Sequence, residues 1–572
     1  MNSNLLLRIR LLLGCLCVFG VIILAKLYTV QIIHGETYVE KADAQYIKPT
    51  VAVFRRGSIF LETKTGTRVG AATVKDGYTI VMNPSLLKDP KGAYTAISQY
   101  IDIDPNIFAE KAAKPNDQYE ELARRADVSV GESIASLKMP GINAYKENWR
   151  VYPGDSLFAH TLGLIGYDST NKVTGRYGLE RTYQDVLNRT NEESKVNFFA
   201  EIFGNLQKSV FQGSAKEGDI VTSLDPALGN YLEQILAKTQ GQWGSDSIGG
   251  IIMDPKTGEI YAMSARPTFD PNDLSGIKDP RIFSNPLIEN VYEMGSIIKP
   301  LTMAAGIDSK AITKKSTYND TGTMTLEGKK ISNYDGKARG VIPMQEVLSQ
   351  SLNIGAATIA LKMGNEEFRR YFTSFGIGDV TGIDQPNEQK GIVDNLKSNR
   401  QIEHATASYG QGIAMTPITT VRALSILANG GKLVTPHLVK EIDYLDGSIK
   451  NIPPPAGVQV IQKETADDVT GMLVTVVDSA IAKAHPGIKM EHYSIAAKTG
   501  TAQIADHANG GYYSDRYLHS FFGYFPAYNP RFIVFLYHIN PKGAQYASET
   551  LVDPFIDIAK FIINYYEIPP DR

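Results

Sequence analysis

Apolar residues just after residue 225 recur at the spacing of a helix with one buried face. From Leu228 to Leu236 they stand at i, i+3, i+4, i+7 and i+8, a period close to 3.6 residues. Asp225 is a suitable N-cap residue, and Pro226 suits the first helical position, where a missing N–H costs little. The pattern predicts a helix that begins at Pro226 and packs on a core.

Further apolar runs predict strands on either side of a helix-rich middle, which extends from about residue 296 to 430. The expected strands are 248–253 and 259–264, joined as a hairpin, and then 494–503, 520–525 and 531–539, followed by a closing amphipathic helix at 553–567. Because strands lie at both ends and helices between them, we expect an α+β domain: an antiparallel sheet with helices on both faces.

An apolar segment near the N-terminus predicts a membrane anchor. Residues 11–25 carry no charge, Lys26 interrupts the run, and Arg8 and Arg10 precede it. With the Lys26 ammonium reaching for the interface, residues 11–30 make about the 20 positions that a spanning helix needs. The arginines favour a cytoplasmic tail, 1–10, and an extracytoplasmic remainder. A cleaved signal peptide and a lipoprotein site are alternatives that the flanking residues fit poorly.

The rest of the chain is predicted to form two domains. A mixed, non-catalytic pedestal (dimerisation-like) domain occupies 31–217, and its polar last stretch, 192–217, is typical of an interdomain connection. The catalytic domain occupies 218–572 and contains the predicted sheet. A length of 572 residues is consistent with several domains.

Composition excludes several classes of function. The net charge is −3 and the basic residues are dispersed, so the sequence shows no basic patch of the kind that binds nucleic acid. The two cysteines, Cys15 and Cys17, lie in the apolar segment, so a disulfide framework or a cysteine-based zinc site in the remainder is excluded. The nine histidines show no metal-ligand spacing. No metal and no cofactor are expected.

Three short motifs carry the candidate chemistry: Ser296-Ile-Ile-Lys299, Ser351-Leu-Asn353 and Lys498-Thr-Gly500. A serine hydroxyl becomes a nucleophile when a neighbouring base takes its proton. Lys299 lies on the same helical face as Ser296, and burial beside a second cation, Lys498, would lower its pKa toward the neutral base. Ser296 is therefore the predicted nucleophile and Lys299 the predicted base.

The second and third motifs predict proton relay and peptide binding. The Ser351 hydroxyl can relay a proton, and the Asn353 amide can hold Lys299 and a substrate carbonyl. Thr499 and Thr501 can bind a carboxylate, and Gly500 permits a substrate backbone to approach closely. We expect an extended peptide with a free C-terminal carboxylate to bind as an added strand.

In this order the motifs resemble those of the class B penicillin-binding proteins, the membrane-anchored peptidoglycan D,D-transpeptidases. Residues 292–300 stand where the family usually has E-P-G-S-x-x-K-P, with Met294 in place of the proline. Further segments that match the family are 253–263, 267–272, 408–412, 428–431, 498–503 and 522–527. The resemblance implies a transpeptidase (serine β-lactamase-like) fold and covers almost the whole chain.

The resemblance also implies a reaction and partners. Ser296 would attack the penultimate D-Ala carbonyl of a peptidoglycan stem peptide, and β-lactams would acylate the same serine. Backbone N–H groups of Ser296 and Thr501 would form the oxyanion hole, while Ser351 and Lys498 assist the leaving group. The S-x-N form of the second motif resembles the septal, cell-division branch, whose expected partners are a polytopic membrane glycosyltransferase and division proteins.

Four alternatives stay open at this point. An elongation-type class B transpeptidase more often carries S-x-D in the second motif. A serine β-lactamase shares the three motifs, although a long pedestal and an anchor suit it poorly. A β-lactam sensor would need a cytoplasmic signalling domain, and a non-catalytic divisome scaffold would tolerate loss of the motifs.

Three pedestal segments also match the family. Segments 150–155 and 178–183 are expected to place Arg and Glu side chains in buried structural ion pairs rather than in catalysis. The remaining segment, 46–60, resembles the family's R-G-x-I-x-D-R-x-G element, but residues 61–64 stand where that pattern has its Asp and Arg, which leaves the usual salt bridge there in doubt. Tyr409 and Gln411 can either line the cleft or pack in the core, and His519 is expected to be structural.

Overall fold

The computed structural model describes residues 55–572 except 115, 171, 190–216 and 507–508, together with residues 14, 19, 20 and 26. The predicted tail, 1–10, the anchor, 11–30, apart from those four residues, and the connection at 192–217, apart from residue 217, lie outside the described residues. No helix in the described part is both long enough and apolar enough to cross a membrane.

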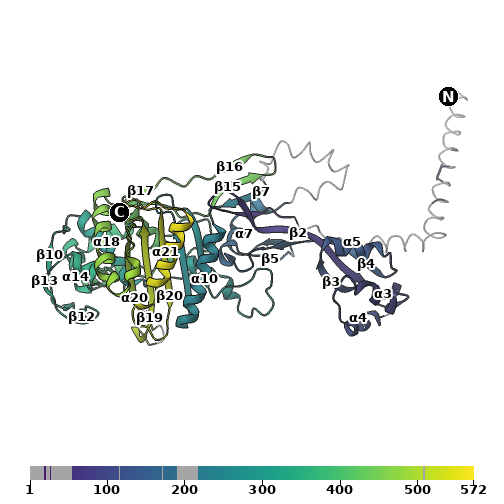
Figure 1. Ribbon diagram of the computed structural model, residues 1–572, viewed down its shortest axis with the longest axis horizontal. Helices are drawn as coiled ribbons and strands as arrows, with labels where there is room; N and C mark the ends of the chain where they lie inside the picture. Colours follow the sequence, from purple (N-terminus) through teal and green to yellow (C-terminus); the bar gives the residue numbers. More distant parts are fainter. Residues whose placement is uncertain are drawn as a thin grey trace, which may run out of the picture. The chain divides into compact units, whose positions relative to one another are not determined.

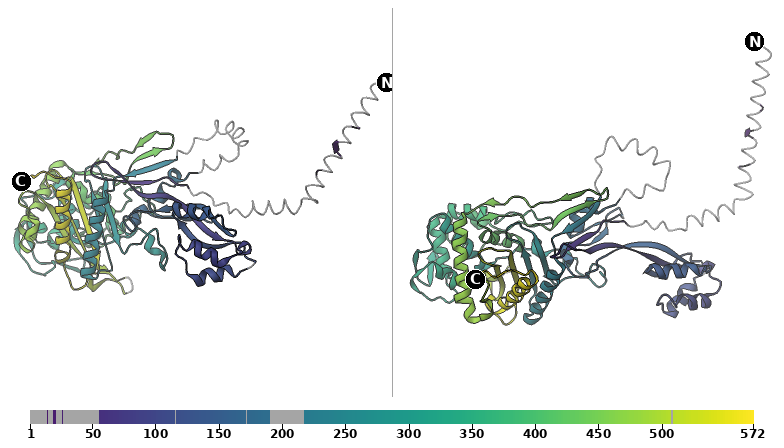
Figure 2. Two further views of the ribbon diagram at one scale, coloured as in Figure 1. Left: turned by 45° about the vertical axis from the view of Figure 1, so that its right-hand side comes forward. Right: turned by 45° about the horizontal axis from the view of Figure 1, so that its top comes forward.

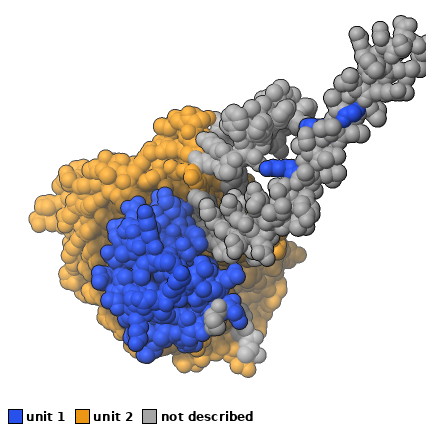
Figure 3. Space-filling model, turned by 90° about the vertical axis from the view of Figure 1, so that its right-hand side faces the viewer, with its two compact units in different colours: residues 1–54, 75–149 blue, residues 55–74, 150–572 orange. Residues whose placement is uncertain are grey.

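The chain divides into two compact units, coloured separately in Figure 3. The first comprises Met1–Phe54 and Lys75–Trp149, and the second comprises Arg55–Val74 and Arg150–Arg572. The second unit thus includes two segments of the predicted pedestal, 55–74 and 150–217, beside the predicted catalytic domain. The division into these units does not test the domain boundary expected between residues 217 and 218, which stays a prediction.

The first unit is a small α/β body with its own core. Its elements are η2 (Pro84–Leu86), α3 (Pro90–Ile97), α4 (Pro105–Ala112), β3 (Glu120–Ala126), α5 (Val128–Ser136) and most of β2 (Arg68–Met82) and β4 (Ile142–Val151). Asp89 and Asp104 cap α3 and α4 through their carboxylates, each before a proline at the first helical position. Ile80, Ile97 and Phe108 are among the buried residues of this core.

Part of the second unit forms a sheet around β1. Strand β1 (Ile59–Glu62) runs antiparallel to the start of β2 and parallel to β7 (Gly218–Thr222), which pairs with β15 (Val439–Tyr444) and through it with β16 (Ile449–Asn451). The short elements between β4 and residue 190 are α6 (Ala159–Leu162), β5 (Ile165–Tyr167), β6 (Val173–Gly175), α7 (Gly178–Thr182) and α8 (Gln184–Leu187).

Glu180 on α7 forms the buried ion pairs that the sequence predicts. Its two carboxylate oxygens accept hydrogen bonds from Arg56 Nε at 2.5 Å and Arg150 Nε at 2.6 Å. All three side chains are almost fully excluded from solvent. Glu62, in the segment that departs from the family pattern, instead pairs with Lys440 at 2.5 Å. The structural role predicted for these Arg and Glu residues is confirmed.

A five-stranded antiparallel sheet is the centre of the second unit. Its strand order is β18 (Ala496–Ala505), β19 (Tyr512–Phe525), β20 (Phe532–Ile539), β8 (Ser247–Met253) and β9 (Ile260–Arg266). Side chains alternate between the two faces of a strand. On β19, Phe521 contacts Phe555 of α21 (Val552–Tyr565), whereas the Tyr524 hydroxyl contacts Thr470 of α18 (Lys463–Thr475). Helices therefore cover both faces, as predicted.

Helices α10 (Pro226–Trp243) and α21 lie side by side on the first of these faces (Figures 1 and 2). Tyr231 and Phe561 stack between them with ring centroids 4.1 Å apart. The predicted cap is confirmed, because the Asp225 carboxylate accepts hydrogen bonds from the backbone N–H groups of Ala227 and Leu228.

A largely helical region fills the middle of the unit. Its helices and turns are η4 (Pro280–Phe283), α11 (Pro286–Glu289), η5 (Gly295–Ile298), α12 (Lys299–Asp308), α13 (Gln345–Ser349), α14 (Asn353–Met363), α15 (Asn365–Ser374), η6 (Asp394–Lys397), α16 (Gln401–Ala407) and α17 (Pro417–Ala428). Beyond α18 come the π-helical turn η7 (Val476–Ile481), α19 (Ala482–Ala484), η8 (Pro486–Ile488) and, after β20, α20 (Ala547–Thr550).

The helix-rich middle also contains strands that the sequence did not predict. They form two hairpin-like pairs, β10 (Thr317–Asp320) with β13 (Gly340–Pro343) and β11 (Thr323–Leu326) with β12 (Lys329–Ser332), while β14 (Lys432–Leu433) pairs with β17 (Val458–Gln459). We call residues 317–343 the tongue. Its strands have four residues each, too few to show a clear alternation in the sequence.

Candidate active site

Ser296 lies on a tight turn at the start of a buried helix. The turn is η5, a 3-10 helix, and α12 begins at Lys299, with Pro300 in its first turn as predicted. A 3-10 helix has three residues per turn, so Ser296 and Lys299 share one face. Ser296 is half-buried, and no hydrogen bond of its hydroxyl to the described residues is present. The hydroxyl is thus available to a substrate.

The helix that begins at Lys299 carries its ammonium into the protein interior. Lys299 is fully buried, and its Nζ donates to the Ser351 carbonyl oxygen at 2.6 Å and to Ser351 Oγ at 3.2 Å. Lys498 on β18 is 2% exposed, and its Nζ donates to the same Ser351 Oγ at 3.1 Å and to the Thr499 carbonyl at 2.9 Å. One hydroxyl thus joins the three motifs.

Burial changes the protonation of both lysines, because a low-dielectric surrounding disfavours the charged form. Burial, reinforced by the charge of Lys498, holds the pKa of Lys299 well below its usual value. Burial also lowers the pKa of Lys498 to about 7. Lys299 is accordingly suited to accept a proton at neutral pH, and Lys498 lies close to its own titration point.

Strand β18 lies directly against the Ser296 turn. Gly295 has a φ of +65°, and a Cβ at this position would stand 2.7 Å from the Thr501 carbonyl oxygen. A Cβ at Gly500 would stand 2.8 Å from the Met294 carbonyl oxygen, to which Ser520 Oγ donates at 2.8 Å. Two glycines therefore allow the close approach that brings the Lys498 motif to the nucleophile.

β18 also offers a free edge. It is the terminal strand of the five-stranded sheet, so one of its sides has no partner strand in the described part of the chain. Thr499 and Thr501 on this strand are half-buried. Thr501 Oγ1 accepts a hydrogen bond from the Ala547 backbone N at 3.0 Å, which leaves the hydroxyl proton of Thr501 for another acceptor.

The second motif departs in one respect from the expected arrangement. Asn353 opens α14, and its amide nitrogen donates to the Ser332 carbonyl of the tongue at 2.9 Å, without a hydrogen bond to Lys299. Lys299 instead binds the backbone of Ser351. Ser351 has a φ of +56°, a left-handed conformation that is unusual for a serine and recurs at functional sites.

Sequence reasoning missed two contacts around the site. Glu293 accepts hydrogen bonds from the Gly412 backbone N and the Tyr512 hydroxyl, each at 3.0 Å, and burial raises its pKa. Tyr334 of the tongue and Tyr546, just before α20, meet edge to face with ring centroids 6.1 Å apart. Glu293 lies inside the first motif segment and could have been singled out, whereas no local signal pairs the two tyrosines.

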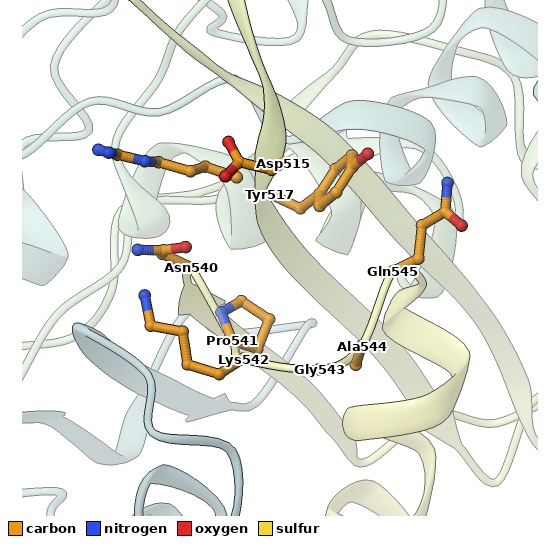
Figure 4. A pocket seen from close by; sticks show the side chains of 9 residues that line it. Asp515, Tyr517, Asn540, Pro541, Lys542, Gly543, Ala544 and Gln545 are labelled. Atoms are coloured by element: carbon orange, nitrogen blue, oxygen red, sulfur yellow. The ribbon is translucent and has the colours of Figure 1, made fainter.

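Tyr409 and His519 both lie in the protein interior. Tyr409 is buried and belongs to the main core, and His519 is fully buried, as expected of a structural histidine. An open polar pocket of about 830 Å³ lies beside the first half of β19, lined by residues 515–517 of that strand and by residues 540–545, which follow β20 (Figure 4). None of the predicted site residues lines it.

Two family descriptions match this chain. Residues 248–560 match "Penicillin binding protein transpeptidase domain", and residues 56–222 match "Penicillin-binding Protein dimerisation domain". The fold and the three motifs that meet at Ser351 agree with this class of protein. The chain belongs to the class B penicillin-binding proteins, which confirms the resemblance drawn from the sequence.

Relatives and solved structures agree with that assignment. The chain is 29% identical to stage V sporulation protein D of Bacillus subtilis, over 97% of this chain and 85% of that protein. It is 25% identical to the peptidoglycan D,D-transpeptidase FtsI of Escherichia coli, over 99% and 92%. The aztreonam complex of penicillin-binding protein 3 from Mycobacterium tuberculosis has a TM-score of 0.68 at 23% identity, covering 91% of this chain and 98% of that chain.

Proposed function

We propose that this protein is a septal peptidoglycan D,D-transpeptidase that works through an acyl-enzyme on Ser296 and is acylated there by β-lactams. The observation that carries the proposal is the convergence of Lys299 and Lys498 on Ser351 Oγ, beside a strand edge that contacts the Ser296 turn. The name and extent of the FtsI relative support the reaction and the septal role.

In the first half-reaction the substrate is the D-Ala-D-Ala end of a stem peptide, laid along the edge of β18. Ser296 Oγ attacks the penultimate carbonyl carbon while neutral Lys299 takes the hydroxyl proton. Backbone N–H groups of Ser296 and Thr501 stabilise the oxyanion. The C–N bond to the last D-Ala then breaks. Its nitrogen receives a proton through Ser351, which Lys498 reprotonates, and D-Ala leaves. The proton held on Lys299 then passes through the same hydroxyl to Lys498, so that Lys299 is neutral again.

In the second half-reaction the acyl group passes to another stem. The acceptor amine attacks the ester carbonyl, the C–N bond of the crosslink forms, and the bond to Ser296 Oγ breaks. The amine proton returns through Lys299 and Ser351 to the serine oxygen. Thr499, Gly500 and Thr501 hold the donor peptide, Lys498 attracts its terminal carboxylate until that residue leaves, and Asn353 lines the opposite wall. The mechanism uses no cofactor and no metal.

The proposal includes a place and partners. An anchor at 11–30 with its tail, 1–10, in the cytoplasm would hold the catalytic domain outside the membrane, where nascent peptidoglycan is found. A polytopic membrane glycosyltransferase and division proteins are the partners that a septal role requires. Residues 31–217 are proposed as the pedestal on which they dock.

Labelling with a fluorescent penicillin tests the chemistry. We expect a stable adduct on the wild-type chain, none on Ser296→Ala, and normal labelling of Ser374→Ala, a matched control on α15. An adduct on Ser296→Ala would refute the assigned nucleophile. Rapid loss of label from the wild type would indicate a β-lactamase, and crosslinking of lipid-linked precursors would then be absent as well.

A further inference from the structure

A chain of four buried polar side chains lies next to the site, and the proposed mechanism does not use it. It consists of Ser245, His538, Thr550 and His519, each less than 10% exposed. Ser245 Oγ lies 2.7 Å from His538 Nδ1, and His538 Nε2 lies 2.9 Å from Thr550 Oγ1. His519 Nδ1 lies 2.9 Å from the same Thr550 oxygen. Buried polar groups in such a network are worth more than isolated pairs.

The partners of the two imidazoles assign every proton in this chain. His519 Nε2 lies 3.1 Å from the Gln545 carbonyl oxygen, which can only accept, so Nε2 carries a proton. In the neutral ring Nδ1 then accepts from the Thr550 hydroxyl at 2.9 Å, a shorter contact than the 3.4 Å from that hydroxyl to the Ala547 carbonyl oxygen. Thr550 Oγ1 then accepts from His538 Nε2, and His538 Nδ1 accepts from the Ser245 hydroxyl. Both rings are neutral in this assignment. Burial agrees with it, lowering the pKa of His519 to about 4 and that of His538 to about 3.

This network ends on the segment that borders the catalytic strand. Thr501 is in register with His519 on β19, and His519 is in register with His538 on β20, so the three side chains share one face of the sheet. Gln545 and Thr550, which the histidines bind, flank Ala547. The Ala547 backbone N donates to Thr501 Oγ1 at 3.0 Å.

The same segment also borders the polar pocket and contacts the tongue. Gln545 lines the polar pocket in Figure 4, and Tyr546 contacts Tyr334 of the tongue, whose Ser332 carbonyl holds Asn353. A shift of residues 545–547 would therefore move the donor that orients the Thr501 hydroxyl. When Ala547 N donates to Thr501 Oγ1, it occupies one lone pair of that oxygen, and the Thr501 hydroxyl proton points away from Ala547.

We propose that His519, His538 and Thr550 are positioning residues that hold Ala547 N on Thr501, so that the Thr501 hydroxyl donates its proton to the terminal carboxylate of the substrate. They thereby set the preference for a peptide with a free C-terminus. This inference rests on the proposed function, because it assigns an indirect role in recognising the donor peptide of that reaction.

The test compares Thr550→Val, which keeps the shape but removes the shared hydroxyl, with Thr550→Ser, which retains it. Acylation is followed with two peptide thioester donors that differ only in ending in a carboxylate or in a primary amide. The measured quantity is kcat/KM for the carboxylate donor divided by kcat/KM for the amide donor. We expect Thr550→Val to lower this ratio about tenfold, close to the value for Thr501→Val, and Thr550→Ser to keep the wild-type ratio.

A purely structural role would lower both rates together and leave the ratio unchanged, and that result would overturn the inference. Should Thr550→Val fail to fold, His519→Gln takes its place. The glutamine amide can still donate to the Gln545 carbonyl, but it has no acceptor at the position from which His519 Nδ1 binds Thr550. An unchanged ratio for this variant would equally overturn the inference. A wild-type chain that is not acylated, or that shows no preference for the carboxylate donor, would refute the proposed function instead.

Discussion

Lys299 and Lys498 donate to one and the same oxygen, Ser351 Oγ, at 3.2 and 3.1 Å, although they lie on different elements far apart in the chain. A hydroxyl oxygen has two lone pairs, so it can accept from both ammonium groups and still donate its own proton. Two buried cations around one acceptor repel each other. The arrangement therefore favours a neutral Lys299 beside a Lys498 that titrates near neutrality.

The first prediction concerns the pH dependence of acylation. Burial lowers the pKa of Lys498 to about 7, so its positive charge is lost as the pH rises through that value. We expect KM for a donor with a terminal carboxylate to rise from about pH 7 to 9. The replacement Lys498→Arg keeps its charge over that range, and its KM should stay flat. An equally flat wild-type profile would contradict the assigned charge.

The second prediction is that Lys498→Met stabilises the protein while abolishing acylation. A lysine whose pKa is lower in the folded state binds fewer protons there than in the unfolded chain. Its burial thus costs free energy at pH 7, and the cost fades as the pH rises toward the usual lysine pKa of about 10.4. We expect the free energy of unfolding in urea at pH 7 to rise by about 1–4 kcal/mol.

The control for this change is Lys463→Met on α18, whose ammonium is exposed and pairs with Asp467. An exposed substitution of this kind should alter the free energy of unfolding by no more than about 0.5 kcal/mol. The advantage of Lys498→Met over the wild type should shrink between pH 7 and 10. A gain that is independent of pH would show that packing, and not the buried charge, is its source.

The sequence predicted the parts of the site that depend on residue type and order. Ser296 and Lys299 share a face in any tight helical turn. The close approach of Gly295 and Gly500 between the Ser296 turn and β18 was not predicted, because Gly500 was expected only to admit a substrate backbone. The orientation of Asn353 was not predictable, because it depends on the tongue, whose four-residue strands carry little periodicity. The contact of Tyr334 with Tyr546 joins segments remote in sequence, and only the fold brings them together.

The buried histidines illustrate the same limit. His519 was expected to be structural, and its burial agrees with that expectation. Its link to Thr501, however, passes through Thr550 and the backbone N–H of Ala547. A hydrogen bond from a backbone N–H does not depend on residue type, so the sequence could not predict it. Thr501, His519 and His538 lie in one row because of the register of three neighbouring strands, which the sequence alone does not determine.

The third prediction tests the close approach at Gly295. Alanine there would adopt a φ of +65°, which L residues rarely do, and its Cβ would clash with the Thr501 carbonyl. We expect Gly295→Ala to reduce β-lactam acylation at least about 100-fold, since displacing reacting groups by about 1 Å costs that much. Gly471→Ala on α18, where a Cβ meets nothing within 4 Å, is the matched control and should label normally. Equal labelling of both variants would refute the role of contact between the turn and β18.

The last prediction concerns the buried pairs of Glu180. Replacing it by glutamine leaves the guanidinium groups of Arg56 and Arg150 buried without a counter-charge, an imbalance that typically costs about 3–5 kcal/mol. We expect a loss of this size in the free energy of unfolding at pH 7. Glu367→Gln, which breaks an exposed pair with Arg370, should cost less than about 1 kcal/mol.

The pH dependence of this loss identifies its cause. Burial alone would raise the pKa of Glu180, but the charges of Arg150 and Arg56 outweigh it and hold the pKa below its usual value. A depressed carboxylate pKa contributes stability that is complete above the usual value of about 4.3 and disappears as the pH falls through the folded-state pKa. The wild type should therefore lose its advantage over Glu180→Gln on acidification below about pH 4.5. An advantage that persists unchanged at pH 3 would mean that the glutamine disrupts packing, and that the charge of Glu180 contributes little.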